Sequence, residues 1–245
     1  MAHTSSDVAN PTWNTLFKAG GVAGLLTAIL FRRNIGAEVS LFTGFEAIPQ
    51  LVAGWFSLLQ SSPLVGLAFL AFFDLINYAL VGLMFLALGA ALWPSHRTLA
   101  AIAVCSGMVG IAVSFATNIS LTMLSLSHEY AVATSEAQRA ALLASGQAVL
   151  AFHNPLALYP GTGMYMSLLL VATAGLLFSV AMLQGRLFSR ATALVGLVAS
   201  ACDLIYCLTF AFAPSLRVVL IATGGLFWMI WQLLVGVKLL RLAKA

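Results

Sequence analysis

Long apolar runs separated by short polar breaks dominate the chain from beginning to end. Most runs extend over about 20 to 30 residues, which is the length that a helix needs to cross a hydrocarbon core of about 30 Å. The pattern predicts an all-α protein, a polytopic transmembrane helical bundle of about six spans. The spans are expected at residues 13–33, 63–93, 98–126, 164–183, 191–213 and 216–237.

Prolines and cations mark where the spans end. Pro94-Ser-His-Arg97 stops the second span and the third follows at once, so we expect these two spans to form an antiparallel hairpin. Pro214 ends the fifth span. The first span is short, because its apolar stretch lies between Lys18 and the pair Arg32-Arg33. It can cross only if these cations extend toward the headgroups or if the bilayer is thin there.

The first polar stretch outside the spans is expected at residues 34–62. Within it, the sequence from Leu51 to Leu59 predicts an interfacial helix with Trp55 at headgroup level. Residues 1–11 are expected to be a disordered tail, and residues 12–245 to form a single domain.

The second external stretch is expected at residues 128–163. Ser135-Glu-Ala-Gln138 fits the S-x-x-Q capping box of a short helix, which would lie over the mouth of the bundle. His128 and His153 fall in this stretch, where histidines usually cap helices or make loop contacts.

The distribution of cations predicts the orientation, because cytoplasmic loops carry an excess of Lys and Arg. Placing both termini in the cytoplasm puts seven cations inside and four outside. The inside set is Lys18, Arg97, Arg186, Arg190, Lys238, Arg241 and Lys244, and the outside set is Arg32, Arg33, Arg139 and Arg217.

Composition agrees with a membrane protein, since 62% of the 245 residues are hydrophobic and 7% are charged, against roughly a quarter charged in soluble domains. The net charge of +4 does not indicate nucleic acid, because the cations sit singly or in pairs at span ends. We expect the lipid bilayer as the partner instead. Cys105, Cys202 and Cys207 all fall in apolar runs and are expected to be buried small hydrophobic residues.

Asp74 and Asp203 are the only acidic residues within the predicted spans. A carboxylate in the bilayer core costs about 2.5 to 3.5 kcal/mol on insertion scales, so each needs a reason to be there. Together with Asn118, they lie about ten residues, or about 15 Å, below the outer ends of the predicted spans. Both aspartates begin Asp-Leu-Ile with a tyrosine nearby, which reflects either chance or an inverted repeat of the kind found in transporters.

Neighbouring polar residues extend this layer, because positions three and four apart share a helix face. Asn77 and Tyr78 follow Asp74, Tyr206 follows Asp203, and Ser114 belongs to a small and polar stripe in the third span. We therefore predict an outward-facing pocket between spans two, three and five. Its residues would be Asp74, Asn77, Tyr78, Ser114, Asn118, Asp203 and Tyr206.

A structural alternative stands beside the pocket. Small and polar stripes commonly pack transmembrane helices, and the aspartates could be protonated carboxyls that bond helices together. The glycines at positions 20, 21 and 24 indicate close helix approach, and Trp228, Trp231 and Gln232 are interpreted as packing residues.

No catalytic, metal or cofactor motif accompanies the aspartates. The second aspartate follows Ala201-Cys202 rather than the Gly-x-Gly of intramembrane aspartyl proteases. The sequence contains no H-E-x-x-H and no G-x-S-x-G. We expect a protein that is not an enzyme and has no cofactor.

Several sequence segments together resemble one bacterial family. They are Lys18-Ala-Gly-Gly-Val-Ala-Gly24, Phe31-Arg-Arg-Asn-Ile-Gly-Ala-Glu38, the Asp74 helix and Glu136-Ala-Gln-Arg139. They look like proteins of domain-of-unknown-function family 4386, over about residues 15 to 240. The resemblance implies a multi-pass protein of the bacterial inner membrane with about six spans. It does not indicate a catalytic residue in this chain.

Three hypotheses follow from the sequence. The first is a protein that binds or transports a small cation, a proton or an amphipathic molecule through the predicted pocket. The second is a membrane scaffold or accessory subunit whose aspartates pair helices. The third is an intramembrane enzyme acting on lipid, which needs two carboxylates within about one water of each other.

Overall fold

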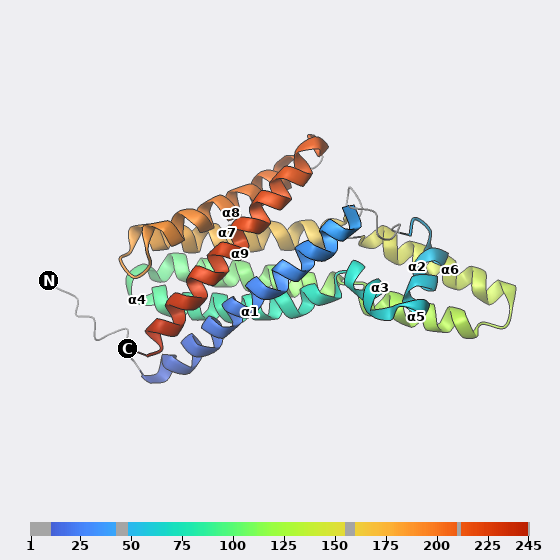
Figure 1. Cartoon of the computed structure of the whole chain (residues 1–245), viewed down its shortest axis with the longest axis horizontal. Helices are drawn as coiled ribbons and strands as arrows, with labels where there is room; N and C mark the ends of the chain where they lie inside the picture. Colours follow the sequence, from blue (N-terminus) through green and yellow to red (C-terminus); the bar gives the residue numbers. More distant parts are fainter. Residues whose placement is uncertain (1–10, 43–48, 155–159, 210–211, 245) are drawn as a thin grey trace. The chain divides into compact units, whose positions relative to one another are not determined.

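The protein is all-helical over the residues that the computed structural model describes (Figure 1). The described backbone covers residues 11–42, 49–154, 160–209 and 212–244, and side chains are described there except at positions 11, 12, 31–42, 214, 217 and 218. The predicted disordered tail lies almost wholly outside the described residues. The helices are α1 (Pro11–Phe42), α2 (Val52–Ser61), α3 (Pro63–Phe69), α4 (Phe72–Thr117), α5 (Ser120–Val132), α6 (Glu136–Phe152), α7 (Thr162–Gln184), α8 (Arg190–Thr209), the 3₁₀ helix η2 (Pro214–Leu216) and α9 (Arg217–Leu242).

Four helical stretches of the described residues are long and apolar enough to cross a membrane. They are Phe72–Val132, Thr162–Gln184, Arg190–Thr209 and Val219–Leu242.

The chain divides into two compact units where the sequence predicted one domain. Unit 1 comprises residues 1–35, 77–112 and 167–245, and unit 2 comprises residues 36–76 and 113–166. Unit 1 therefore holds most of the apolar helices, and unit 2 holds much of the polar sequence between them.

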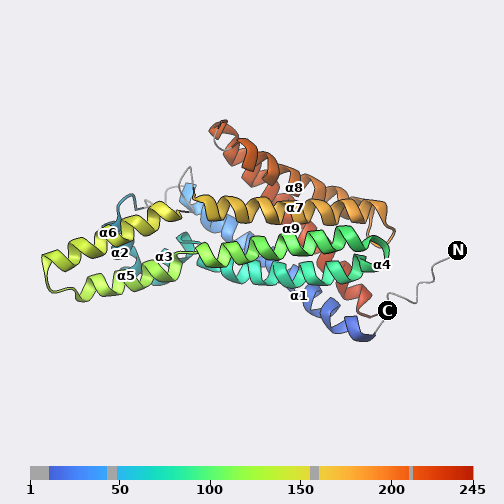
Figure 2. The same cartoon turned by 180° about the vertical axis from the view of Figure 1, so that it is seen from behind.

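The α4 helix is a hairpin rather than one rod (Figure 2). Its backbone leaves helical geometry at His96, where φ is −140° and ψ is 54°. Within unit 1, Gly82 faces Ile111 and Gly89 faces Val104, so the two arms run antiparallel. This is the reversal that Pro94 and Arg97 indicate in the sequence.

Glycines allow the first helix of unit 1 to lie close to its neighbours. A Cβ on Gly20 would collide with the Cβ of Ala87 on α4, and a Cβ on Gly21 would lie 2.7 Å from the Leu240 Cγ on α9. A Cβ on Gly24 would lie 3.1 Å from the carbonyl oxygen of Gln232. The close approach predicted from these glycines is confirmed.

The remaining helix contacts of unit 1 fix the direction of α7. Ser106 of the second α4 arm donates to the Leu170 carbonyl over 2.9 Å, and Gly107 faces Ala174. These pairs make α7 antiparallel to that arm.

Unit 2 has its own core, formed mainly by α2 packing against α5 and α6. Trp55 and Phe56 are buried, and a Cβ on Gly146 of α6 would lie 2.9 Å from the Phe56 ring. The Gln60 side-chain amide donates to the Ser127 carbonyl over 2.8 Å. Trp55, which was predicted at headgroup level, is only 1% exposed, so its side chain packs within this core and does not project from unit 2.

Several helix bounds differ from those predicted. The α1 helix continues through Arg32 and Arg33 to Phe42, because arginine is a good helix former and does not by itself stop a helix. The second predicted span is interrupted at Ala71, whose φ of 61° is left-handed, and the third is interrupted at Asn118.

The first hydrogen bond of the capping box predicted in the second external stretch is confirmed. The Ser135 hydroxyl accepts from the Gln138 backbone N–H over 3.2 Å at the start of α6. The Gln138 side chain returns to the N–H of Thr134 rather than to that of Ser135. The α6 helix ends at Phe152, and the next residue, His153, is buried at the C-cap.

Candidate functional site

Asp203 is the only carboxylate among the described side chains of unit 1, and it faces α9. Its Oδ2 accepts a hydrogen bond from the Trp228 Nε1–H over 2.6 Å. A Cβ on Gly224 would lie 2.8 Å from the Asp203 Oδ1, so the glycine lets the α9 backbone approach the carboxylate. Among the described residues Asp203 forms no ion pair, and the neutral indole N–H is its visible stabilising partner.

Asp203 lies within the apolar length of α8. It is about 20 Å along the helix from Arg190 and about 9 Å from Thr209, taking 1.5 Å per residue. The sequence placed it about 15 Å below the outer end of the span, because that span was expected to continue to Ala213. The end of α8 at Thr209 brings the carboxylate nearer to one end of the helix.

Two buried hydroxyls, Ser200 of α8 and Ser179 of α7, lie along the side of α8 that carries Asp203. Ser200 lies one turn before Asp203, and its Oγ is 2.6 Å from the position that a Cβ on Gly175 would take. One turn further, a Cβ on Gly196 would collide with both the Ser179 Oγ of α7 and the Trp231 Nε1 of α9. These glycines leave space into which polar atoms from three helices converge.

We call Asp203, Ser200, Ser179 and Trp231 the polar row. The last three are fully buried, and within the described residues the Ser200 Oγ, Ser179 Oγ and Trp231 Nε1 have no hydrogen-bond partner. Buried polar atoms normally find a partner, because leaving one unpaired costs about 1 to 3 kcal/mol. The polar row is therefore a group of unsatisfied donors and acceptors that leads away from a carboxylate.

Aromatic rings enclose the polar row. Trp228 and Trp231 make an edge contact with ring centroids 5.1 Å apart, and Phe85 packs on Phe178 at 5.2 Å. The Trp231 ring also meets Phe85 at 6.5 Å. These rings form an apolar surrounding for the buried members of the polar row, and hydrogen bonds are stronger in such a low-dielectric environment.

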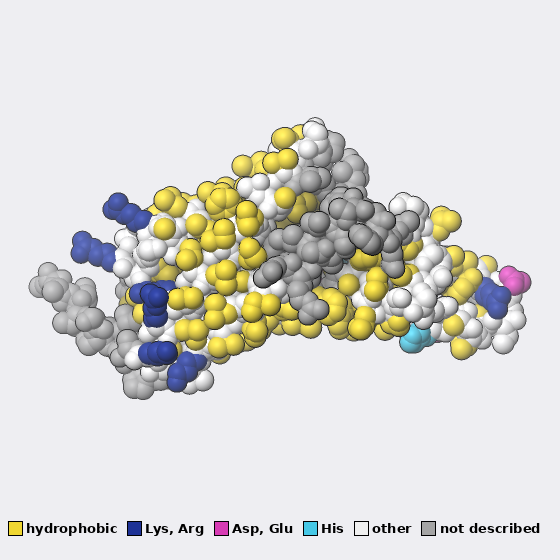
Figure 3. Space-filling view, in the orientation of Figure 1, with side chains coloured by type: hydrophobic (Ala, Val, Ile, Leu, Met, Phe, Trp, Pro, Cys, Tyr) yellow, Lys and Arg dark blue, Asp and Glu magenta, His cyan; other side chains and the backbone are white. Residues whose placement is uncertain are grey.

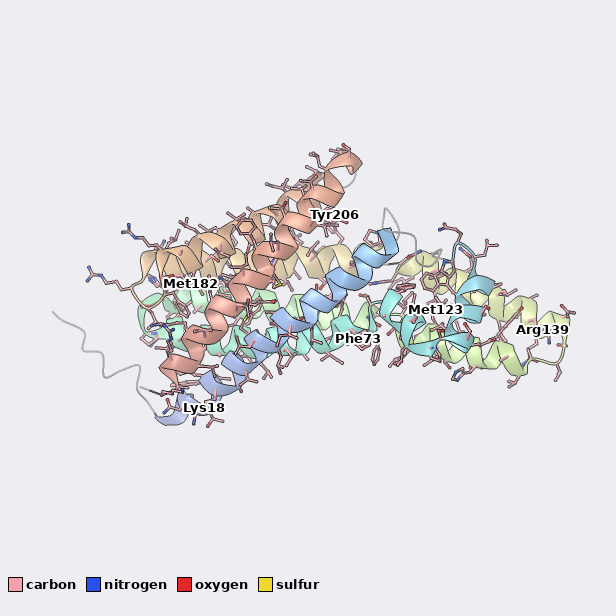
Figure 4. All side chains as sticks on the ribbon, in the orientation of Figure 1. Lys18, Phe73, Met123, Arg139, Met182 and Tyr206 are labelled. Carbon is pink, nitrogen blue, oxygen red and sulfur yellow. The ribbon has the colours of Figure 1, made fainter. Side chains whose placement is uncertain are left out.

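The predicted pocket residues are divided between the two units. Asn77, Tyr78, Asp203 and Tyr206 belong to unit 1, and Asp74, Ser114 and Asn118 belong to unit 2. Figure 4 labels Tyr206, which is buried on α8 one turn after Asp203. The Asn77 Oδ1 is buried and has no hydrogen-bond partner among the described residues, and Tyr78 packs beside the hydrophobic core.

Asn118 uses its side chain in local structure. Its Nδ2 donates to the Ala71 carbonyl over 2.9 Å, and its Oδ1 accepts from the Ser120 backbone N–H over 3.0 Å. It therefore bonds the first backbone N–H of α5 and ties the start of that helix to the left-handed turn before α4. Asp74 is in the first turn of α4 rather than at mid-span, a position where the helix dipole favours a carboxylate.

The partners of Asp203 were not predicted from the sequence. Trp228 and Trp231 were interpreted as packing residues, and the two serines were not singled out. A pattern was present, however, since Gly196, Ser200 and Asp203 recur at spacings of four and three on one helix face.

Other candidate chemistry is limited in the described part of the chain. No group of three His, Cys, Asp or Glu side chains there could hold a metal ion. Cys207 is buried as expected, Cys202 is partly buried, and Cys105 is exposed, so the prediction of burial is wrong for Cys105.

Comparison with known proteins identifies a family and nothing more specific. No curated protein and no solved structure matches the chain. The profile of one family, described as "Domain of unknown function (DUF4386)", matches residues 22–236 and thus most of the chain. The apolar helices and this match agree with the family resemblance in the sequence: the chain belongs to the DUF4386 family.

Proposed function

We propose that the protein crosses the bacterial inner membrane six times with both termini in the cytoplasm. Six spans result when α1, the two arms of α4, α7, α8 and α9 are each counted. The arms are about 36 Å and 31 Å long at 1.5 Å per residue, which suffices for a hydrocarbon core of about 30 Å.

The charge distribution of unit 1 supports this orientation. Figure 3 shows dark blue Lys and Arg side chains gathered at the end of this unit that carries both described chain ends. All seven cations expected inside are described, and they lie near the His96 turn, the α7–α8 connection, the start of α1 and the end of α9. Cations accumulate on the cytoplasmic side of membrane proteins.

Within this bundle, we propose that Asp203 binds and releases a proton and that the protein moves protons, alone or coupled to a small solute, through unit 1. The observation that supports this proposal is an acidic side chain in an apolar helix, which accepts a hydrogen bond from one neutral N–H donor. Buried hydroxyls without a partner among the described residues lie further along the same side of the helix. Ionisable groups in membrane spans are costly and usually serve ion or proton pathways.

The chemistry around Asp203 favours a proton over a metal cation. A bound hard cation requires several oxygen ligands, commonly six or more for Ca²⁺ and Mg²⁺. The carboxylate accepts a hydrogen bond from the Trp228 indole and lies against the Gly224 backbone, and no group of three His, Cys, Asp or Glu side chains in the described part of the chain could hold a metal ion. A protonated carboxyl needs only an acceptor for its O–H, and a hydroxyl such as that of Ser200 can both accept and donate.

The test is proton movement in vesicles. Purified full-length protein is reconstituted into liposomes containing a pH-sensitive dye, and an inward proton gradient is applied under a potassium diffusion potential. Wild-type protein should acidify the lumen, Asp203→Asn should reduce the rate at least tenfold, and Glu129→Gln, an exposed carboxylate of unit 2, should behave as wild type. Equal rates for Asp203→Asn and wild type would contradict the proposal.

A second candidate is a scaffold in which Asp203 only joins two helices. The bond to Trp228 favours it, because it connects α8 and α9 directly. In that case Trp228→Phe and Asp203→Asn should lower thermal stability in detergent by similar amounts, and no proton flux should depend on Asp203. The vesicle assay therefore separates the two candidates.

A further inference from the structure

The crossing of α1 and α9 in unit 1 places several cations together. Gly21 faces Gly236 and Leu240, while Gly24 faces Gln232, so the helices are antiparallel where they meet. Lys18 precedes the crossing on α1, Lys238 and Arg241 follow it on α9, and Lys244 lies just beyond the end of α9. All four are therefore within about two turns, or about 11 Å, of the contact along the helix axes.

The views agree with this arrangement. Figures 1 and 2 both draw the beginning of α1 beside the end of α9, and Figure 4 labels Lys18 on that part of α1. Lys18, Arg241 and Lys244 are exposed and Lys238 is partly buried.

These cations have no described acidic partner. The only ion pair among the described residues joins Arg139 to Glu136 in unit 2, and the only described carboxylate of unit 1 is Asp203, on another helix. Four cations that repel one another and lack counter-charges attract an anion from outside the chain.

The exposed faces above the cations are apolar. On α1, Val22, Leu26 and Ile29 are exposed on the face that begins with Lys18. On α9, Leu233 and Val237 are exposed on the face that ends with Arg241. On each face, apolar side chains are followed by cations within a few turns. A phospholipid has the matching arrangement, with apolar acyl chains next to a charged headgroup.

We propose that the α1–α9 crossing is a binding site for one anionic phospholipid on the cytoplasmic leaflet. The phosphate contacts Lys18, Lys238 and Arg241, with Lys244 at the margin, and the acyl chains follow the apolar faces of the two helices. Arginine contributes a planar pair of donors to the phosphate and lysine contributes point charges. This site is separate from Asp203 and does not depend on proton movement.

The experiment uses full-length protein in a neutral detergent and native mass spectrometry with phosphatidylglycerol. Phosphatidylcholine of the same acyl composition and inorganic phosphate serve as the other probes. The test variant is Lys18→Gln/Lys238→Gln/Arg241→Gln. The matched control, Arg97→Gln/Arg186→Gln/Arg190→Gln, removes the same charge from the same end of unit 1 but from other helices.

Each cation near an anionic headgroup contributes about 1 kcal/mol, so affinity should fall about fivefold for each one removed. We expect the test variant to bind phosphatidylglycerol about a hundredfold more weakly than wild type, and the control variant less than tenfold more weakly. Phosphatidylcholine and inorganic phosphate should not occupy the site at the same concentration. Equal losses in both variants, equal binding of phosphatidylcholine, or occupation by inorganic phosphate would overturn the proposal.

A charge-conserving variant keeps the test decisive if the glutamine variant misfolds. Lys18→Arg/Lys238→Arg/Arg241→Lys should retain binding within a few-fold of wild type. In the wild-type protein, raising the salt concentration should weaken phosphatidylglycerol binding, because the headgroup contact is electrostatic. Binding that is independent of salt, or that is lost in the charge-conserving variant, would also contradict the site.

Discussion

Gly196→Ala tests whether the polar atoms converge on α8 as described. A Cβ at this position would collide with the Ser179 Oγ and the Trp231 Nε1, and both side chains are fully buried. Overpacking of this kind costs about 1 to 3 kcal/mol, while replacing a helical glycine by alanine returns about 0.5 to 1 kcal/mol. Because two fully buried atoms would have to move, the cost should lie in the upper part of its range, and the expected net loss is about 1 to 2 kcal/mol in the free energy of unfolding.

Gly82→Ala is the matched control within the same unit. The nearest atom to a Cβ at Gly82 is the Ile111 Cδ1 at 3.4 Å, an ordinary contact. We expect this variant to be neutral or to gain up to about 1 kcal/mol from helix propensity alone.

Thermal unfolding of both variants in the same detergent gives the comparison. A change of 1 kcal/mol shifts the midpoint of a protein of this size by about 2 to 4 °C. Gly196→Ala should therefore unfold about 2 to 8 °C below wild type, and Gly82→Ala at or slightly above it. A Gly196→Ala protein that unfolds at or above the wild-type temperature would refute the packing described for the polar row.

Three further predictions concern unit 2. Asn118→Ala removes the bonds to the Ala71 carbonyl and the Ser120 N–H, and should destabilise the protein by about 1 to 2 kcal/mol in a thermal melt, whereas Ser125→Ala, an exposed position on α5, should change little. Ala71→Gly should be neutral or stabilising by up to about 1 kcal/mol because φ there is 61°, and a destabilisation beyond 1 kcal/mol would show that the left-handed turn is wrong. Burial lowers the pKa of His153 from its usual 6.5, so the folded state prefers the neutral ring and stability should fall as the pH drops from about 6.5 toward the lowered pKa. His153→Gln should flatten that pH dependence in melts, and an unchanged slope would contradict it.

Some elements could be predicted because their causes are local in sequence. Pro94 and Arg97 stop a helix by backbone chemistry, and the Ser135 cap depends on a residue three positions away. The interruption at Ala71 could not be predicted, because its carbonyl is held by Asn118, 47 positions along the chain. Trp55 was placed at the interface because tryptophan is common there, whereas contacts from distant helices bury it.

The candidate site could be predicted in part for the same reason. Asp203 was identified from the cost of a carboxylate in an apolar span, which depends on one position and its neighbours. Its partner Trp228 is 25 residues away on another helix, and Ser179 reaches the row from a third. Asn118 was assigned to a pocket from its depth and from the small and polar stripe of the third span, whereas its side chain bonds the start of α5 and the Ala71 carbonyl.

The most direct test of proton binding by this protein is whether Asp203 changes its protonation state in the folded state. Infrared difference spectra of the full-length protein in lipid, recorded across a pH titration, resolve the C=O band of a protonated carboxyl. We expect a reversible band that is absent in Asp203→Asn, is shifted in Trp228→Phe by loss of the N–H donor, and is unchanged in Glu129→Gln. A wild-type spectrum with no such band at any pH, or a band that persists in Asp203→Asn, would contradict the assignment of proton binding to this carboxylate.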